Sequence, residues 1–215
     1  MLVGASFRVM TMATRVIAVV LIAVYGCNGG RDSAASTRDA GAGRSASTAP
    51  ADTTPSMDTL LRRFQAGLPR PDSLTGTSAT REALTRRYLE AIARSDTTAL
   101  RDMHITRAEY AHVYFPSSKM MKPPYELPPD VAWMLHTADS NKGIRTVLGR
   151  FGGQLLRFGD VRCPGEPLRE GHNVVWRDCR VRYRAPNGIE AEQSLFAAII
   201  ERDGRFKFFS YAATL

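Results

Sequence analysis

The sequence has no long hydrophobic run and none of the common catalytic signatures. Its longest apolar stretch, residues 16–25, has ten residues, which would span about 15 Å as a helix, half the hydrocarbon core of a bilayer. It contains no phosphate-binding loop, GxSxG, HExxH or dinucleotide fingerprint. These absences argue against the enzyme classes that such motifs mark. Enzymatic activity is left uncertain, with a non-enzyme favoured and no cofactor expected.

Lysine is scarce, whereas arginine is abundant. Only four of the 29 basic residues are lysines, and the formal net charge is +8. A basic balance favours anionic partners, such as membrane headgroups or nucleic acid. We expect mainly a solvated, arginine-rich surface, because charge by itself governs solubility and loose binding.

The N-terminal region is typical of an export signal. Arg8 and Arg15 precede the apolar residues 16–25, which have the length and flanks of a signal-peptide core. The sequence VYGC that follows resembles the lipobox of bacterial lipoproteins, in which the cysteine becomes the first residue of the mature chain and carries the lipid. Gly26 supplies the small residue before that cysteine, and Tyr25 is bulkier than is usual at its position. An ordinary cleaved signal and an uncleaved anchor are the alternatives.

This resemblance predicts an exported, membrane-anchored lipoprotein with palmitate-type acylation at Cys27. Asn28 is not the aspartate that resembles an inner-membrane retention signal, so the outer membrane is weakly favoured over the periplasmic face of the inner membrane. Residues 28–56 contain no large apolar side chain and cannot bury enough surface to fold. We therefore expect a signal peptide at 1–26, a lipidated, disordered tether at 27–56 and one domain at 57–215. Export also makes a nucleic-acid partner unexpected.

The first half of the domain has helical patterns. Residues 80–94 carry a four-residue apolar spacing after the cap Thr80, and Asp96 caps a second helix through residue 103. A capping box at 106–109 begins a third helix. A proline-rich loop at 117–129 precedes a helical region to residue 151, which Gly143 leaves as one helix or two.

The second half has the two-residue period of strands. Strands are expected at 154–161, 172–184, 189–202 and 205–213, with hairpin turns at Asn187-Gly188 and Asp203-Gly204. Two-residue turns would place Arg184 opposite Ala191, Trp176 opposite Ile199, and Ile199 opposite Phe208. Both faces of this meander are substantially apolar. We expect helices on one face and, on the other, more helix, the N-terminal segment or a second copy of the chain in a homodimer.

The pattern predicts an α+β fold, in which N-terminal helices pack on a curved antiparallel sheet formed by a C-terminal meander of about four strands. The helix pair EALTRRYLEAIARSDTTALRDM and the final SLFAAIIERDGRFKFFSYAA resemble the cone-shaped nuclear transport factor two-like (SnoaL-like) superfamily. These stretches cover about a quarter of the 159 residues after the tether. The whole chain also resembles exported bacterial lipoproteins. The resemblance implies a cone with a cavity between the sheet and the helices.

Two cysteines follow the lipobox. With Cys27 acylated, Cys163 and Cys179 form an even pair in an oxidising compartment, so we predict a disulfide, with two buried thiols as the alternative. It would close a 17-residue loop, counting both ends, and stabilise the fold by about 3 kcal/mol in the chain-entropy model.

No residue set in the chain identifies a catalytic or metal site. Glu109 and His112 are three residues apart on one expected helix, but a metal site needs further ligands, so no metal is expected. Residues 176–184, WRDCRVRYR, interleave arginines with aromatics as some nucleic-acid surfaces do. Ion pairs with Glu190 and Glu192 across the sheet are the favoured alternative.

The cone resemblance places several side chains where they could face a cavity. Asp178 and Arg180 share the face of Trp176, where they form either a salt bridge at the rim or a functional pair. The full set of candidate ligand-binding residues is Tyr110, Tyr114, Trp133, His136, Trp176, Asp178, Arg180 and Phe208. None matches a catalytic residue of an enzyme of the superfamily.

Three functions remain open at this stage. The first is a lipid-anchored envelope protein whose non-catalytic domain binds or scaffolds another envelope protein. The second is a module that binds a small apolar ligand in a cone cavity lined by Trp133, Trp176 and Phe208, with residues 117–129 as a lid. The third, least favoured, is an isomerase, dehydratase or hydrolase in the same cavity.

Overall fold

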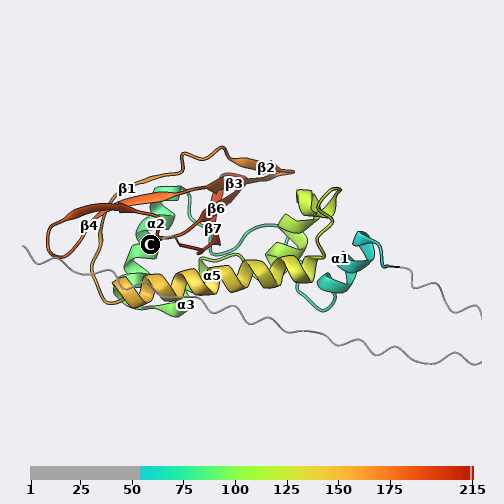
Figure 1. Cartoon of the computed structure of the whole chain (residues 1–215), viewed down its shortest axis with the longest axis horizontal. Helices are drawn as coiled ribbons and strands as arrows, with labels where there is room; N and C mark the ends of the chain where they lie inside the picture. The colour runs from blue at the N-terminus through green and yellow to red at the C-terminus, as the bar shows by residue number, and fades with distance from the viewer. Residues whose placement is uncertain (1–53, 214) are drawn as a thin grey trace, which may run out of the picture. The chain divides into compact units, whose positions relative to one another are not determined.

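The computed structural model describes residues 54–213 and 215 (Figure 1). The expected signal peptide, the lipidation site Cys27 and nearly all of the expected tether lie outside the described residues. No helix in the described part of the chain combines the length and the hydropathy that a membrane span requires.

Short capped helices make up the first part of the domain. The side chains of Thr80 and Asp96 cap α2 and α3, and Thr106 with Glu109 forms a complete capping box, as the sequence predicts. Ser56 caps a further helix. The segments are α1 (Met57–Gln65), α2 (Arg81–Ala93), α3 (Thr97–Asp102), α4 (Arg107–Glu109), the π-helical turn η1 (Tyr110–Tyr114) and the 3-10 turns η2 (Phe115–Ser117) and η3 (Lys119–Met121).

The helical region after the proline-rich loop is one continuous helix, α5 (Pro129–Phe151). Gly143 in its middle is required by packing, because a Cβ atom there would lie 1.9 Å from the carbonyl oxygen of Tyr211. The C-terminal segment therefore runs directly against the backbone of α5. The glycine that weakened the helix prediction makes this close approach possible.

Seven antiparallel strands form two sheets in the described chain. One sheet has the order β1-β4-β5 and the other the order β2-β3-β6-β7. The strands are β1 (Arg157–Arg162), β2 (Leu168–Glu170), β3 (Asn173–Arg177), β4 (Arg180–Arg184), β5 (Glu190–Gln193), β6 (Ala198–Arg202) and β7 (Arg205–Ser210). An α+β fold with helices before antiparallel strands is confirmed.

Two long predicted strands are each divided between the sheets. Asp178, at φ +56°, separates β3 from β4, because a left-handed residue cannot continue a ladder. Residues 194–197 separate β5 from β6. The described residues therefore form seven strands, whereas the sequence predicts about four. The three-residue β2 was missed because it is too short to show an alternating pattern.

The predicted register is right at two positions and wrong at one. Trp176 lies opposite Ile199, and Ile199 lies opposite Phe208. Arg184, however, pairs with Glu190 rather than Ala191. The loop before β5 has three residues, not two, and ends at Gly188 with φ +84°, the usual bulge position of a three-residue hairpin.

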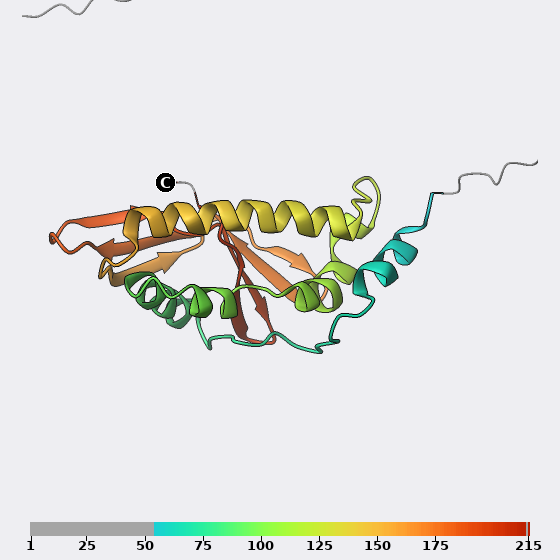
Figure 2. The same ribbon diagram turned by 90° about the horizontal axis from the view of Figure 1, so that it is seen from below.

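The domain has two hydrophobic cores. The first core packs α2 and the C-terminal half of α5 on the three-stranded sheet and on one face of the four-stranded sheet, around Tyr88, Val147, Val181 and Phe208. The second core packs α1, η1 and the N-terminal half of α5 on the four-stranded sheet around Phe64, Tyr110 and Ile200. In Figure 2, α5 runs alongside the segment from α2 to η1, and the strands lie behind both; in Figure 1 the strands lie above α5.

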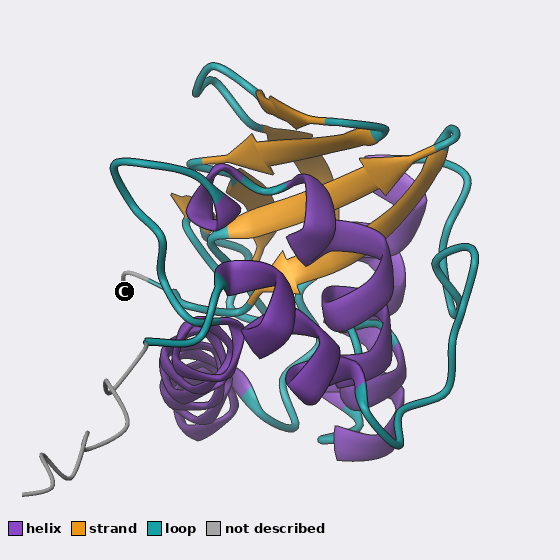
Figure 3. Ribbon diagram, turned by 90° about the vertical axis from the view of Figure 1, so that its right-hand side faces the viewer, coloured by secondary structure: helices purple, strands orange, loops and turns teal. Residues whose placement is uncertain are grey.

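Helices of the same chain cover the second apolar face of the four-stranded sheet, which is one of the alternatives that the sequence leaves open. Val175 and Ile200 on that face belong to the second core. The three-stranded sheet differs, because its outward side chains are exposed arginines, among them Arg180, Arg182 and Arg184. Figure 3 shows most of the helices below the strands and helical turns in front of them.

The predicted disulfide is present. Cys163 and Cys179 are bonded, and Cys179 is fully buried in the first core. The bond ties the loop after β1 to the bend between β3 and β4.

Candidate functional site

The structure brings together four of the eight candidate ligand-binding residues. The rings of Tyr110 and Trp133 have centroids 5.0 Å apart, and His136 lies 5.3 Å from Tyr110 and 5.6 Å from Trp133. Tyr114 stands 5.4 Å from Tyr110. These side chains come from η1 and the first two turns of α5, and they belong to or pack against the second core.

Two other candidates lie in or against the first core. Phe208 is fully buried, 4.6 Å from the ring of Phe196. Trp176 donates its indole N–H to Glu201 at 2.8 Å, and the guanidinium of Arg81 lies 4.4 Å from its ring centre. The three residues Trp133, Trp176 and Phe208 therefore do not line one cavity.

Asp178 and Arg180 lie on the surface at the bend between β3 and β4. Both are exposed, and neither takes part in an ion pair within the described residues. Asp178 packs its carboxylate against Gly165, where a Cβ atom would come within 2.5 Å of it. This carboxylate therefore lies close against the loop that carries Cys163.

A hydrogen-bonded group that the sequence did not reveal joins three segments. His104 Nδ1 lies 2.9 Å from the carbonyl oxygen of Ile105, which can only accept, so Nδ1 carries the proton. His104 Nε2 then accepts a hydrogen bond from the Ser140 hydroxyl at 3.0 Å. The Ser140 oxygen accepts the backbone N–H of Tyr211 at 2.9 Å. The partners are 36 and 71 residues apart, so no local pattern could have signalled them.

Both histidines of this region are neutral. Burial lowers the pKa of His104 to about 4, and the nearby Lys207 lowers it further, while the hydrogen bond to Ile105 opposes the fall. Burial lowers the pKa of His136 to about 3, with His104 contributing in the same direction. At neutral pH they act as polar, uncharged groups.

Two adjoining hollows lie beside these residues along α5. One of about 220 Å³ is bordered by Leu100, Ile144, Leu148 and Tyr211. The other, of about 300 Å³, is bordered by Ile105, Trp133 and Thr137. Arg101, His104, Ser140 and Asn141 border both. We call the two together the α5 groove, which follows α5 on the side of α3 and α4.

Arginines stand along the α5 groove. Arg101 borders both hollows, Arg145 borders the first and Arg107 the second, and all three are exposed. Arg107 also lies 4.8 Å from the ring centre of Phe64. Within the described residues none of the three is in an ion pair with a carboxylate. The groove therefore combines apolar side chains with unpaired positive charge.

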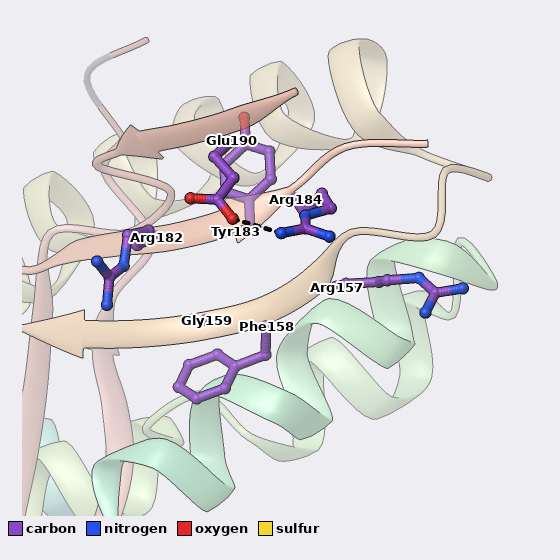
Figure 4. Close-up of a pocket in the computed structure, with 7 residues that line it drawn as sticks. All are labelled: Arg157, Phe158, Gly159, Arg182, Tyr183, Arg184 and Glu190. Carbon is purple, nitrogen blue, oxygen red and sulfur yellow. Dashed lines mark hydrogen bonds and ion pairs between the residues drawn. The ribbon is translucent and has the colours of Figure 1, made fainter. Parts of the chain in front are cut away.

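A third hollow, of about 400 Å³, lies on the outer face of the three-stranded sheet (Figure 4). Arg184 is paired with Glu190 at 2.7 Å. Asp160 bonds Arg162 at 2.7 Å and lies 3.7 Å from Arg182, and these arginines hold the pKa of Asp160 below its usual range. Two of the four arginines of WRDCRVRYR are thus paired with carboxylates, Arg184 with Glu190 as expected and Arg182 with Asp160, whereas Arg177, Arg180 and Glu192 form no ion pair within the described residues.

The Glu109–His112 pair is not arranged as a metal site. Both carboxylate oxygens of Glu109 accept from Lys207, at 3.0 and 2.8 Å, and both groups are almost fully buried. Glu109 also accepts the backbone N–H groups of Thr75 and Thr106. In the part of the chain that the structure covers, no three His, Cys, Asp or Glu side chains are grouped to hold a metal ion.

The α5 groove is thus the best candidate site, because neutral polar groups, apolar side chains and unpaired arginines converge there. Comparison with protein-family models, with curated proteins and with solved structures finds no match for the chain, so the chemistry of the groove rests on its own residues.

Proposed function

We propose that the chain is an exported, lipid-anchored envelope protein whose folded domain binds a partner or ligand and does not catalyse a reaction. The observation that carries the export is the disulfide between Cys163 and Cys179, because such bonds form and persist in oxidising compartments. The lipobox-like VYGC and the predicted signal peptide support acylation at Cys27.

Binding is favoured over catalysis by how the reactive groups are used. Ser140 and His104 form a serine–histidine pair, but the serine oxygen already accepts a backbone N–H and the serine is almost fully buried. The carboxylate of Glu109 is already in a buried ion pair with Lys207. A general base must reach a substrate proton, and these groups are committed to structural bonds. The α5 groove offers recognition without such a base.

We also propose that the strands and helices form a cone. Support comes from the order of helices before antiparallel strands and from two long strand segments that are interrupted at Asp178 and at 194–197. A sheet interrupted in this way resembles the nuclear transport factor two-like arrangement. The resemblance adds no catalytic residue to the chain.

A module for a small apolar ligand is the second candidate, and one observation favours it. Trp133, Ile144 and Leu148 border the α5 groove, so part of an apolar ligand could bind there. The site would then be the groove and not an enclosed cavity between Trp133, Trp176 and Phe208.

The anchor is tested by intact mass spectrometry of the full chain, produced in a bacterium that processes lipoproteins and extracted from its membranes. We expect a mature chain beginning at Cys27 with acyl groups attached, and a mass lower by two hydrogen atoms before reduction than after it. Cys27→Ser should lose the acyl mass and leave the membrane fraction, and should keep the disulfide. An unprocessed, unacylated chain with free thiols would refute the proposal.

A further inference from the structure

We infer that the α5 groove binds a single-chain anionic amphiphile of the fatty-acid class, with its carboxylate on Arg101 and its alkyl chain along α5. This inference rests on the proposal that the domain binds and does not catalyse. It does not depend on whether Cys27 is acylated.

The groove extends along α5 to both sides of Arg101. It follows α5 from Leu148 to Trp133, a separation of fifteen residues, which is about 22 Å at the rise of an α-helix. The two hollows of about 220 and 300 Å³ share Arg101, His104, Ser140 and Asn141 on their borders. A head group held at these shared residues could therefore extend its alkyl chain into either hollow.

The floor of the groove suits an alkyl chain. Leu100, Ile144 and Leu148 border one hollow, and Ile105 and Trp133 border the other. The polar groups between them, His104 and Ser140, are bonded to each other at 3.0 Å, and His104 is neutral because burial lowers its pKa to about 4. An alkyl chain that crosses them leaves no buried charge unpaired.

The rim of the groove favours an anionic ligand. Arg101, Arg107 and Arg145 border it, and no carboxylate of the described residues pairs with them. Asp102 and Asp139 are near in sequence but border neither hollow. A guanidinium presents a planar fork that fits a carboxylate with two hydrogen bonds. Of the three arginines only Arg101 borders both hollows. A head group with one negative charge can therefore pair with this central guanidinium.

The two features together select the ligand class. A neutral apolar compound would leave the arginines unused, and a small inorganic anion would leave the apolar floor exposed. A long-chain carboxylate uses both.

The chain contains its own reporter for this binding. It has two tryptophans, of which Trp133 borders the groove and Trp176 does not. In full-length Trp176→Phe protein, emission then comes from Trp133 alone. We expect dodecanoate, kept below its aggregation concentration, to change this emission to saturation. Dodecanol should bind at least tenfold more weakly, because it lacks the charge.

Substitutions at matched arginines locate the head group. Arg101→Gln should weaken dodecanoate binding about tenfold and leave dodecanol binding unchanged. Arg180→Gln is the control, because Arg180 is also exposed and unpaired but lies on β4 outside the groove. Asn141→Phe, at the junction of the two hollows, should abolish binding without adding a second tryptophan, while the thermal unfolding midpoint stays close to that of the parent.

Several results would overturn the inference. They are an emission change that does not saturate, equal binding of dodecanoate and dodecanol, equal effects of Arg101→Gln and Arg180→Gln, or tighter binding of dodecyl phosphate than of dodecanoate. Mass spectrometry of Cys27 is a separate measurement. An unacylated chain that binds dodecanoate would refute the anchor alone, and an acylated chain that does not bind would refute the groove alone.

Discussion

The first core satisfies its buried polar groups with hydroxyls, whereas the second core is packed against charges. In the first core, the hydroxyls of Tyr88 and Tyr211 each donate to a backbone carbonyl at 2.7 Å. Beside the second core, Glu109 and Lys207 form an ion pair at 2.8 Å, and Glu170 is also buried. Lys207 lies directly opposite Ile200 of that core.

This difference predicts different responses to substitution. Loss of a tyrosine hydroxyl removes one hydrogen bond, worth about 1 kcal/mol. Loss of one partner of a buried ion pair leaves a charge without water or counterion, which is far more costly. The second core should therefore be the more fragile of the two to a single change, although it contains fewer buried apolar residues.

The largest effect is expected for Lys207→Met. The substitution leaves the buried carboxylate of Glu109 unpaired, so we expect a loss of about 3–5 kcal/mol in the free energy of unfolding, measured by urea denaturation. The double variant Glu109→Gln/Lys207→Met should regain most of this loss. It removes both charges, and the amide oxygen of glutamine can still accept from Thr75. If the single variant lost under 1 kcal/mol, the contrast between the cores would be wrong.

The disulfide tests the first core. Replacing both Cys163 and Cys179 with alanine opens a loop whose ends are 16 residues apart, and the chain-entropy model gives a loss of about 3 kcal/mol. Because the bond joins the loop after β1 to the bend before β4, amide hydrogen exchange should rise more in β1 and β4 than in β6 and β7. A uniform rise across both sheets would show that the two cores unfold as one unit.

The sequence predicts the first core better than the second for a physical reason. Leu84, Tyr88 and Ile92 follow the period of a helix facing an apolar core, and all three are fully buried. Glu109 and Lys207 are also buried, but a charged residue in a sequence indicates an exposed position unless its partner is known. That partner is 98 residues away, and no local pattern carries such a pairing.

The candidate site was likewise only partly predictable, because some of its contacts join residues far apart in the sequence. Tyr110, Tyr114, Trp133 and His136 are brought together because aromatic residues on helices tend to be buried, which the sequence indicates. The contact of His104 with Ser140 depends on how α5 packs beside the α3–α4 segment, and the bend at Asp178 depends on one left-handed residue. Neither property is encoded in periodicity, so the division into two sheets and the α5 groove could not be predicted.

Acidification should destabilise the boundary between the cores. His104 and His136 have folded-state pKa values lowered to about 4 and about 3, below the ordinary value near 6.5, so the unfolded chain binds protons first as the pH falls. Stability should be full well above pH 6.5 and decrease below it by up to about 1.4 kcal/mol per pH unit for each histidine, until the pH reaches the folded values. Urea midpoints measured from pH 7.5 to 4.5 test this slope.

His136→Phe provides the matched control for the pH slope. His136 Nε2 is buried and has no hydrogen-bond partner in the described structure, so phenylalanine should be tolerated and should remove about half of the slope. The charges that face His104 are Lys207 and Glu109. The pKa of Glu109 is lowered by Lys207 and by backbone N–H groups although burial opposes this, so its own contribution is lost only below about pH 4.5. An unchanged slope in His136→Phe would contradict the assignment.

The smallest effect is expected at the start of α3, which carries Arg101 to the groove. The side chain of Asp96 accepts the backbone N–H of Ala99 at 2.9 Å, and Asp96→Ala should cost about 1 kcal/mol because that N–H loses its partner. Asp96→Asn keeps an acceptor and loses only the 4.0 Å contact with Arg94, so it should be nearly neutral. Because α3 has only six residues, fraying in Asp96→Ala should also shift Arg101 and weaken dodecanoate binding, while Asp96→Asn should not. Equal stability and equal binding in the two variants would show that packing against the first core, and not the cap, holds α3 in place.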